Sequence, residues 1–593
     1  MAYRGQPSPF TTLIDGPASP SGPYRALKHF GLTLLCAAWV FLGLVGHDPW
    51  KSEDATTFGV VWDMMNGGSM LTPTLAGTPY PERPPLAYAL GTLAGELFQG
   101  WLKPHDAARL SVAVLLALTL AMVSLATREL AGKSIRWLPV LIFVGSIGLW
   151  DRSHQLSPEV GLLAGLSVAL YGFAVAPRRP VVGGIVLGAG TGLAFLAHGF
   201  QGPIWIMGAA VLLPILSGQW RSTRYASTAG TAILVAATLL AAWPLALALQ
   251  APTYLAAWWR GQHLGSFVAV FTPRADANPL YILQNLPWFT WPSAPLVLWT
   301  LWTRGRGFNG GLRSTGVLVP GAMALAILVG LLIMPEPRPN DLMMLIVPLV
   351  VLASIEVDTL KRGFSGALDW FGILTFALLG SLAWGAWWDA YTHGMSRPIA
   401  RLLRDTTVGY QPSFHARAMI VCVLLTILWL MLVRPARRSN RRAILNWAAG
   451  TTLLWAMFAT IWLPYLDSRR SYRLVAEDAA MHLPRDGCIA SRNLGDAQRA
   501  LFYYFAGIRT IPEDGIAVDG CPTLLVQYAR GDIDAGGGPG WIVSWEGQRR
   551  GDETERYVIY TRDRDAMPQT GGSPLPARRT RPNATQPPGG ERH

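Results

Sequence analysis

The chain has 593 residues, of which 51% are hydrophobic, 14% are charged and 25 are tryptophan, and its formal net charge is +13. A soluble globular protein carries more charge on its surface, so the composition excludes that class. A positive net charge can indicate a nucleic-acid partner, but most arginines here lie in short loops between apolar runs, where they set membrane topology. We therefore expect a polytopic α-helical membrane protein with no nucleic-acid partner.

Apolar runs long enough to cross a bilayer recur along residues 25–466, after a tail at 1–24 that we expect to be disordered and cytoplasmic. They predict a transmembrane domain of about thirteen helices, near residues 27–46, 108–127, 137–150, 159–176, 182–197, 203–217, 226–249, 287–302, 316–334, 342–356, 367–388, 416–433 and 444–464. An odd number of crossings places the two ends of the chain on opposite sides of the membrane.

The distribution of positive charge orients these helices. One set of short loops holds 17 Lys and Arg in 55 residues: 128–136, 177–181, 218–225, 303–315, 357–366 and 434–443. The alternate set holds 10 in 146 residues: 47–107, 150–158, 198–202, 250–286, 335–341 and 389–415. The positive-inside rule predicts that the first set is cytoplasmic and the second faces outward.

The first external loop, 47–107, contains two predicted helices. The first, 53–66, follows Ser52 as a possible N-cap and has apolar side chains at helical spacing: Phe58, Val61, Trp62 and Met65. We expect it to lie on the membrane surface with this face down. The second, 86–99, is too short for a span, and we expect it also to lie along the outer surface.

Residues 467–565 are polar and mixed, and they predict a small external α/β domain. One segment has a helical pattern, and three are strand-like: YRLVAEDAAMHL, then PTLLVQYA, GWIVSWEG and ERYVIYTRD. Cys488 and Cys521 are the two cysteines of this domain, so we expect them to form a disulfide in an oxidising compartment. Residues 566–593 are rich in Pro, Gly, Arg and Thr and are expected to be disordered.

Two adjacent charged pairs stand out in the first external loop: Glu53-Asp54 and Glu82-Arg83. Each has a plain structural interpretation, since acids in a first turn complement the helix dipole and an exposed ion pair contributes little. Their order and spacing within the loop favour a functional interpretation.

This loop resembles the first external loop of the GT-C class of polyprenyl-phosphate-dependent glycosyltransferases. The nearest families are the lipid A aminoarabinose transferases and their relatives among the protein O-mannosyltransferases. The motif residues match in order and spacing: Glu53-Asp54-Ala55, Met64-Met65, Gly68-Ser69-Met70, Pro73, Ala76-Gly77 and Glu82-Arg83-Pro84-Pro85-Leu86. The specific motif covers only this loop, whereas the resemblance in architecture covers most of the chain.

The sequence departs from the family pattern at several positions. The first acid pair has the reverse order, Arg83 and His198 stand where lysines are usual, and Ser266 stands where an arginine is usual. Glu159 matches an acid that is usual near the second external loop. A divergent specificity or a weakened activity therefore stays open.

The resemblance implies an inverting glycosyltransferase that moves a sugar from a polyprenyl phosphate to an acceptor at the periplasmic face of a bacterial inner membrane. The acceptor would be lipid A or a related envelope glycolipid. Arg83, held by Glu82, and Arg338 would bind the donor phosphate. Glu53 or Asp54 would take the proton from a hydroxyl acceptor, with Glu53 favoured by position, or would orient a phosphate acceptor.

Further candidate site residues are Glu159, His198 and His263. The chemistry requires no cofactor, although Glu82 and His263 together form a weaker candidate for a metal site. Two other functions stay open: a protein O-glycosyltransferase, and a non-catalytic or flippase-like protein that binds lipid-linked sugars. We expect membrane lipids as neighbours, a lipid or glycan as acceptor, and a monomer.

Overall fold

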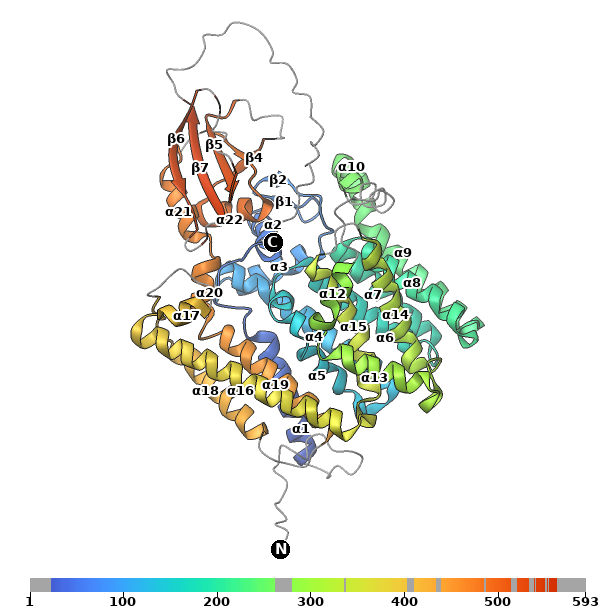
Figure 1. The fold of residues 1–593 in the computed structure, drawn as a ribbon. Helices are drawn as coiled ribbons and strands as arrows, with labels where there is room; N and C mark the ends of the chain where they lie inside the picture. Colours follow the sequence, from blue (N-terminus) through green and yellow to red (C-terminus); the bar gives the residue numbers. More distant parts are fainter. Residues whose placement is uncertain are drawn as a thin grey trace, which may run out of the picture.

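The computed structural model of the protein describes residues 23–562, apart from 262–279, 335–337, 403–409, 434–438, 485–486, 514–519, 533–537, 539, 550–551 and 553. Residues 1–22 and 566–593 of the two predicted tails lie outside the described part. Figure 1 shows a bundle of helices and, above it, a smaller part made of a β-sheet with helices beside it.

The bundle contains sixteen of the described helices. In chain order these are α1 (Pro23–Phe41), α4 (Pro104–Ala131), α5 (Leu138–Val144), α6 (Pro158–Val175), α7 (Pro180–His198), α8 (Gln201–Leu216), α9 (Thr223–Gln250), α10 (Pro252–Trp259), α12 (Leu280–Phe289), α13 (Ser293–Gly305), α14 (Thr315–Ile333), α15 (Met343–Ile355), α16 (Arg362–His393), α17 (Arg397–Leu402), α18 (Ala416–Val433) and α19 (Asn440–Phe458).

Seven of the described helices are long and apolar enough to cross a membrane, and two bent helix pairs raise the number to 9. The seven are α4, α6, α7, α9, α14, α16 and α18. The predicted polytopic membrane architecture is therefore confirmed at this coarser level. The number of thirteen spans stays a prediction, because several of the predicted runs form shorter apolar helices, such as α8.

The predicted span 137–150 is not one continuous helix. Its chain bends by 60° between residues 133–144 and 147–154. At the bend, the Trp447 indole donates a hydrogen bond of 2.8 Å to the carbonyl of Gly145, and a Cβ on this glycine would lie 2.7 Å from the same ring. Packing of α19 against this point thus accounts for a break that hydropathy does not reveal.

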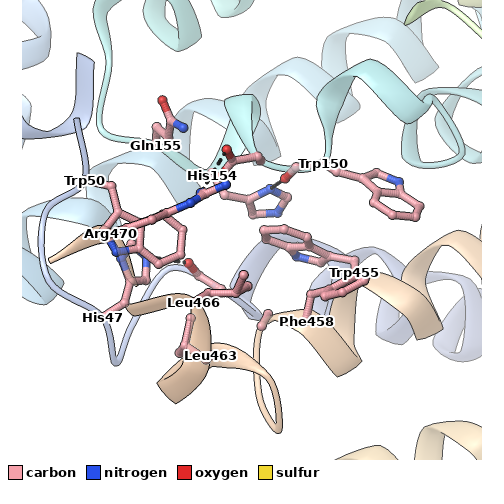
Figure 2. Close-up of a pocket in the computed structure, with 13 residues that line it drawn as sticks. His47, Trp50, Trp150, His154, Gln155, Trp455, Phe458, Leu463, Leu466 and Arg470 are labelled. Atoms are coloured by element: carbon pink, nitrogen blue, oxygen red, sulfur yellow. Dashed lines mark hydrogen bonds and ion pairs between the residues drawn. The ribbon is translucent and has the colours of Figure 1, made fainter. Parts of the chain in front are cut away.

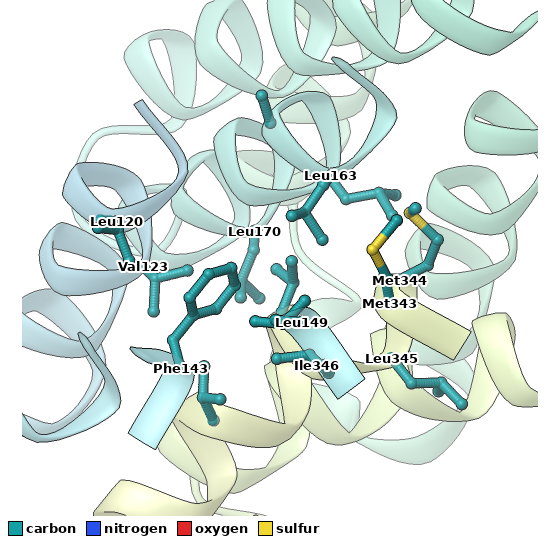
Figure 3. Packing of buried hydrophobic residues seen from close by; sticks show 14 of the residues in the cluster. Leu120, Val123, Phe143, Leu149, Leu163, Leu170, Met343, Met344, Leu345 and Ile346 are labelled. Carbon is teal, nitrogen blue, oxygen red and sulfur yellow. The ribbon is translucent and has the colours of Figure 1, made fainter. Parts of the chain in front are cut away.

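The core of the bundle lies around α6, whose neighbours are α4, α7 and α15 (Figure 3). Glycines let α6 and α7 approach closely: a Cβ on Gly165 would lie 2.6 Å from the backbone nitrogen of Ala194, and one on Gly172 would lie 2.5 Å from that of Leu187. Small residues at such contacts are typical of membrane helix pairs. Because the two helices are antiparallel neighbours, the start of α6 meets the end of α7, where both carry ionisable residues.

Helix α2 (Glu53–Met65) lies between α3 (Leu86–Phe98) and the part of the chain above the bundle (Figure 1). Phe58 packs edge-on against Tyr504 at 4.8 Å between ring centroids, and Val61 faces Gly91 of α3. The expected placement of this helix, apolar face down on the membrane, is therefore wrong, since that face is buried against protein. Ser52 also makes no side-chain capping bond.

The chain after residue 462 forms the upper part. Its helices are α20 (Leu463–Arg470), α21 (Arg473–Met481) and α22 (Asp496–Ala506). Its five strands lie in the order β4-β3-β5-β7-β6: β3 (Ile489–Arg492), β4 (Thr510–Pro512), β5 (Thr523–Ala529), β6 (Trp541–Gly547) and β7 (Glu555–Arg562). β3 pairs in parallel with β4 and β5, whereas β5, β7 and β6 are antiparallel. The predicted helix and the three predicted strands correspond to α21, β5, β6 and β7.

The predicted disulfide between Cys488 and Cys521 is present. It joins the residue before β3 to a residue just before β5, so it ties together the starts of two neighbouring parallel strands. Cys36 and Cys422 are free.

Candidate functional site

The loop that leads into α2 is fixed by a buried ion pair between Asp54 and Arg109 of α4. The guanidinium donates to both carboxylate oxygens, at 3.1 and 2.7 Å, and also to the backbone carbonyls of His47 and Asp48. Asp54 accepts two further bonds, from the backbone amides of Trp50 and Leu156. Burial raises the pKa of the Asp54 carboxyl, but the interaction with Arg109 outweighs it, so the pKa lies below its ordinary value.

Glu53, the neighbour of Asp54, faces a different environment. Its carboxylate lies 3.4 Å from the guanidinium of Arg338, and its side chain is 24% exposed. Burial and the nearby Glu159 carboxylate raise the pKa of Glu53 to about 7, although Arg83 and Arg338 act in the opposite direction. A carboxyl group with such a pKa is half-ionised near neutral pH, which suits proton transfer.

A short hairpin leads to the second charged pair. Its strands are β1 (Thr74–Leu75) and β2 (Thr78–Pro79), joined by Ala76 and Gly77, which have φ of 50° and 83°. Both turn residues are left-handed, as in a type I′ turn, which is an unfavourable conformation for alanine. Asp63 of α2 holds the hairpin by accepting from the Thr74 hydroxyl and the Gly77 amide, each at 2.9 Å.

Helix α10 fixes the loop beyond the hairpin. The Tyr254 hydroxyl lies 3.0 Å from the carbonyl of Pro73 and 2.8 Å from that of Tyr80. Glu82 and Arg83 follow two and three residues after Tyr80, so their position depends on this contact.

The ends of α6 and α7 meet Arg83. Nη1 of Arg83 lies 3.1 Å from Nδ1 of His198, the last residue of α7. Nε2 of the same imidazole lies 3.6 Å from Oε1 of Glu159, in the first turn of α6. Both Glu159 and His198 are buried. The three residues thus form a chain of contacts from Glu159 in α6, through His198 in α7, to Arg83 in the loop.

The structure thus brings five of the predicted site residues together: Glu53, Arg83, Glu159, His198 and Arg338. Asp54 is adjacent in sequence but faces the buried Arg109 instead.

Arg83 and Glu82 are placed differently from the expectation that one holds the other. Within the described chain, the hydrogen-bond partner of Arg83 is His198, and the Glu82 side chain is exposed. His263 lies outside the described residues, so the candidate metal site at Glu82 and His263 stays a prediction. Among the residues that the structure describes, no group of three or more His, Cys, Asp or Glu is arranged to hold a metal ion.

Sequence reasoning missed the residues that hold the first loop to the upper part of the molecule. Asp48 accepts from Arg473 of α21, at 3.1 Å through Nε, and from the Ser471 hydroxyl at 2.6 Å. Burial raises the pKa of Asp48, but these bonds outweigh it and leave the pKa below its ordinary value. The one available signal was Arg109, a permanent charge inside an apolar run, which implies a buried partner.

Two hollows lie in the described part of the protein. One, of about 250 Å³, has a lining that includes Trp50, Trp150, Trp455 and Arg470 (Figure 2). The other, of about 600 Å³, is an apolar groove along α9 and α10, and its lining includes Phe200, two residues after His198.

No protein-family model matches the chain. An undecaprenyl phosphate-α-4-amino-4-deoxy-L-arabinose arabinosyl transferase from Pseudomonas savastanoi pv. phaseolicola is 26% identical over 243 residues, which is 40% of this chain and 44% of that protein. A transferase of the same name from Pseudomonas fluorescens is 24% identical over 372 residues, or 60% of this chain and 65% of that protein. The matched regions thus span about half to two thirds of these relatives.

The fold matches over a larger part of the chain. The crystal structure of ArnT from Cupriavidus metallidurans bound to undecaprenyl phosphate superimposes with a TM-score of 0.65, covering 92% of this chain and 99% of that one, at 17% identity. The chain is therefore a polytopic membrane protein that shares the fold of this ArnT structure and is related in sequence to the arabinosyl transferases named above.

Proposed function

We propose that the chain is an inverting glycosyltransferase that moves a sugar from a polyprenyl phosphate to an acceptor at the outer, periplasmic face of a bacterial inner membrane. The observation that carries this proposal is the convergence of Glu53, Arg83, Glu159 and Arg338 from four separate segments. Ionisable groups gathered from distant segments are typical of a catalytic site. The names of the relatives support a polyprenyl-phosphate donor.

In this proposal Arg83 binds the phosphate of the donor. A guanidinium has five N–H donors, so Arg83 can keep its bond to His198 and still present parallel donors to a phosphate. Arg338, whose side chain is 63% exposed, supplies a second cation beside Glu53. The apolar groove along α9 and α10, whose lining includes Phe200, two residues after His198, suits the polyprenyl tail.

The reaction itself is a displacement at the anomeric carbon. An acceptor oxygen forms a bond to that carbon from the face opposite the phosphate, while the bond from the carbon to the phosphate oxygen breaks. Polyprenyl phosphate leaves with the electron pair, and its developing negative charge is stabilised by Arg83 and Arg338. Attack from the opposite face inverts the configuration of the sugar.

Glu53 takes the acceptor proton when the acceptor is a hydroxyl, since its pKa of about 7 matches that role. Asp54 is unsuited to it, because Arg109 and two backbone amides occupy its oxygens. We expect the acceptor to be lipid A or a related envelope glycolipid. A phosphate acceptor is already ionised, and Glu53 would then orient it.

The test is transfer of a labelled sugar from polyprenyl phosphate to lipid A in nanodiscs. Arg83→Ala should lower turnover by about 10²–10³-fold, because it removes the main stabilising charge on the leaving phosphate. Arg83→Lys should lower it less, since the charge remains and the two-donor fork is lost. Arg178→Ala, which removes an exposed arginine from the loop before α7, at the end of this helix opposite His198, is the matched control and should leave transfer unchanged. Near-wild-type transfer by Arg83→Ala would overturn the proposal.

A further inference from the structure

The bond between Arg83 and His198 determines where the imidazole carries its proton. Arginine is always protonated and can only donate, so the Nδ1 atom that lies 3.1 Å from Arg83 Nη1 must accept. An accepting Nδ1 carries no proton, and the ring is therefore neutral, with its proton on Nε2. That nitrogen points to Oε1 of Glu159 at 3.6 Å, on the side where a carboxylate favours a donor.

We propose that His198 is a positioning residue that holds Arg83 as a neutral hydrogen-bond acceptor, with Glu159 keeping the imidazole in the Nε2–H tautomer. This inference rests on the proposed function, because it assigns what His198 does for the phosphate-binding arginine. It also means that His198 does not act as a second phosphate-binding cation. A protonated Nδ1 would turn a donor toward the donor groups of Arg83 and place two cations side by side.

Packing makes this arrangement rigid. Glu159 and His198 are 3% and 4% exposed, and they project from adjacent helices. The two helices are in close contact right beside these residues, since a Cβ on Gly161 would lie 2.7 Å from the Cβ of Ala197. A long, flexible arginine side chain benefits from such a fixed acceptor, because its ordering cost falls before the donor arrives.

The Glu159 carboxylate has one further hydrogen-bond acceptor. Its Oε2 is buried and has no hydrogen-bond partner among the described residues. A buried carboxylate oxygen of this kind can accept from a closer-moving Nε2–H or from a hydroxyl or ammonium group of the bound sugar.

Three substitutions at position 198 separate the two ring nitrogens. His198→Asn places an amide oxygen near the former Nδ1 and keeps an acceptor for Arg83. His198→Gln reaches the former Nε2 position and serves Glu159 instead. His198→Leu keeps the volume and removes both the hydrogen bond to Arg83 and the contact with Glu159. Each is measured by donor KM and kcat, by acceptor KM, and by undecaprenyl phosphate binding in nanodiscs.

We expect His198→Leu and His198→Gln to lower kcat/KM for the donor by about 10- to 100-fold, the value of a hydrogen bond to a charged group. His198→Asn should stay within a few-fold of wild type, and the acceptor KM should be unchanged in all three. Equal loss in Asn and Gln, or tighter undecaprenyl phosphate binding by His198→Lys, would overturn the inference, since the latter would indicate that a cation is wanted there.

A double-mutant cycle separates this inference from the proposed function. If His198 acts through Arg83, adding His198→Leu to Arg83→Ala should cause little further loss. Additive losses, with Arg83→Ala itself severely impaired, would reject the positioning role and leave the proposed function standing. An active Arg83→Ala protein would reject the function itself. Thermal unfolding of each variant verifies folding, and the comparison of Asn with Gln stands if the Leu variant does not fold.

Discussion

Two neighbouring clusters of charge, each formed by the first external loop and its neighbours, are built in opposite ways. Around Asp54 and Arg109 the polar atoms are saturated: the guanidinium donates to two carboxylates and two carbonyls, and both residues are about 1% exposed. Around Glu53 and Arg83 the bonds are fewer, Arg338 is mostly exposed, and one oxygen of Glu159 has no described partner.

The difference teaches which of two adjacent acids is structural. A closed cluster has no capacity left for a ligand, and its value is in fixing the backbone. An open cluster with a raised carboxyl pKa keeps capacity for a substrate, at some cost in stability. Glu53 and Asp54 are adjacent in the chain but belong to these different clusters. Substitution of Asp54 should therefore lower stability, whereas substitution of Glu53 should lower transfer.

The largest expected effect is on the stability of the closed cluster. Asp54→Asn leaves Arg109 buried without its main counter-charge, and breaking such a pair costs about 3–5 kcal/mol. The unfolding temperature in detergent should fall clearly, and transfer should fall with it. An unchanged unfolding temperature would contradict the closed assignment.

Glu53→Gln is the matched substitution in the open cluster, and it should spare stability while lowering transfer. With a hydroxyl acceptor the loss should be about 10²-fold or more, since a general base is removed. Wild-type kcat/KM should rise with pH through about 7, as Glu53 loses its proton, and the variant should lack this step. A flat wild-type profile, with full transfer by the variant, would indicate that the acceptor arrives ionised.

The raised pKa of Glu53 also predicts a stability difference with a definite sign. Because the folded pKa, about 7, lies above the ordinary value of 4.5, the folded protein binds the proton more tightly than the unfolded chain. Wild-type stability should therefore decline between pH 4.5 and 7, relative to Glu53→Gln, which has no charge to bury. Unfolding temperatures of the two proteins should diverge over this range and run parallel above it.

A smaller effect is expected at the contact between Arg473 of the upper part and Asp48, which precedes the closed cluster of Asp54 and Arg109. Arg473→Ala removes the guanidinium that pairs with Asp48 and should cost about 1–3 kcal/mol, the range for a bond to a charged group. Hydrogen exchange of residues 47–54 should quicken, and Arg473→Lys should restore part of the protection. Unchanged exchange in the alanine variant would show that this contact does not fix the loop.

The smallest effect should come from Arg338, at the exposed edge of the open cluster. Its ion pair with Glu53 spans 3.4 Å, and exposed pairs are worth about 0–1 kcal/mol. Arg338→Ala should raise the donor KM a few-fold and leave the unfolding temperature unchanged. A loss as large as that of Arg83→Ala would make Arg338 the principal phosphate ligand.

Local patterns account for what was predictable. Hydropathy indicates a polytopic membrane protein, strand-like segments give β5, β6 and β7, and two cysteines in one polar segment give the disulfide. The motif spacing in the first external loop pointed to Glu53 and Arg83 as site candidates. These features depend on residues that are close in sequence or, for the disulfide, on the number of cysteines in one segment.

The tertiary structure alone decided the partners. Arg109 meets Asp54 across 55 residues, and Arg83 meets His198 across 115, because the start of α4 and the end of α7 both lie beside the loop. Likewise, amphipathic spacing in α2 indicates a buried face but not what covers it; the cover is α3 together with α22, which is more than 400 residues away. A sequence pattern records that a side chain needs a partner, whereas only the packing of distant helices supplies one.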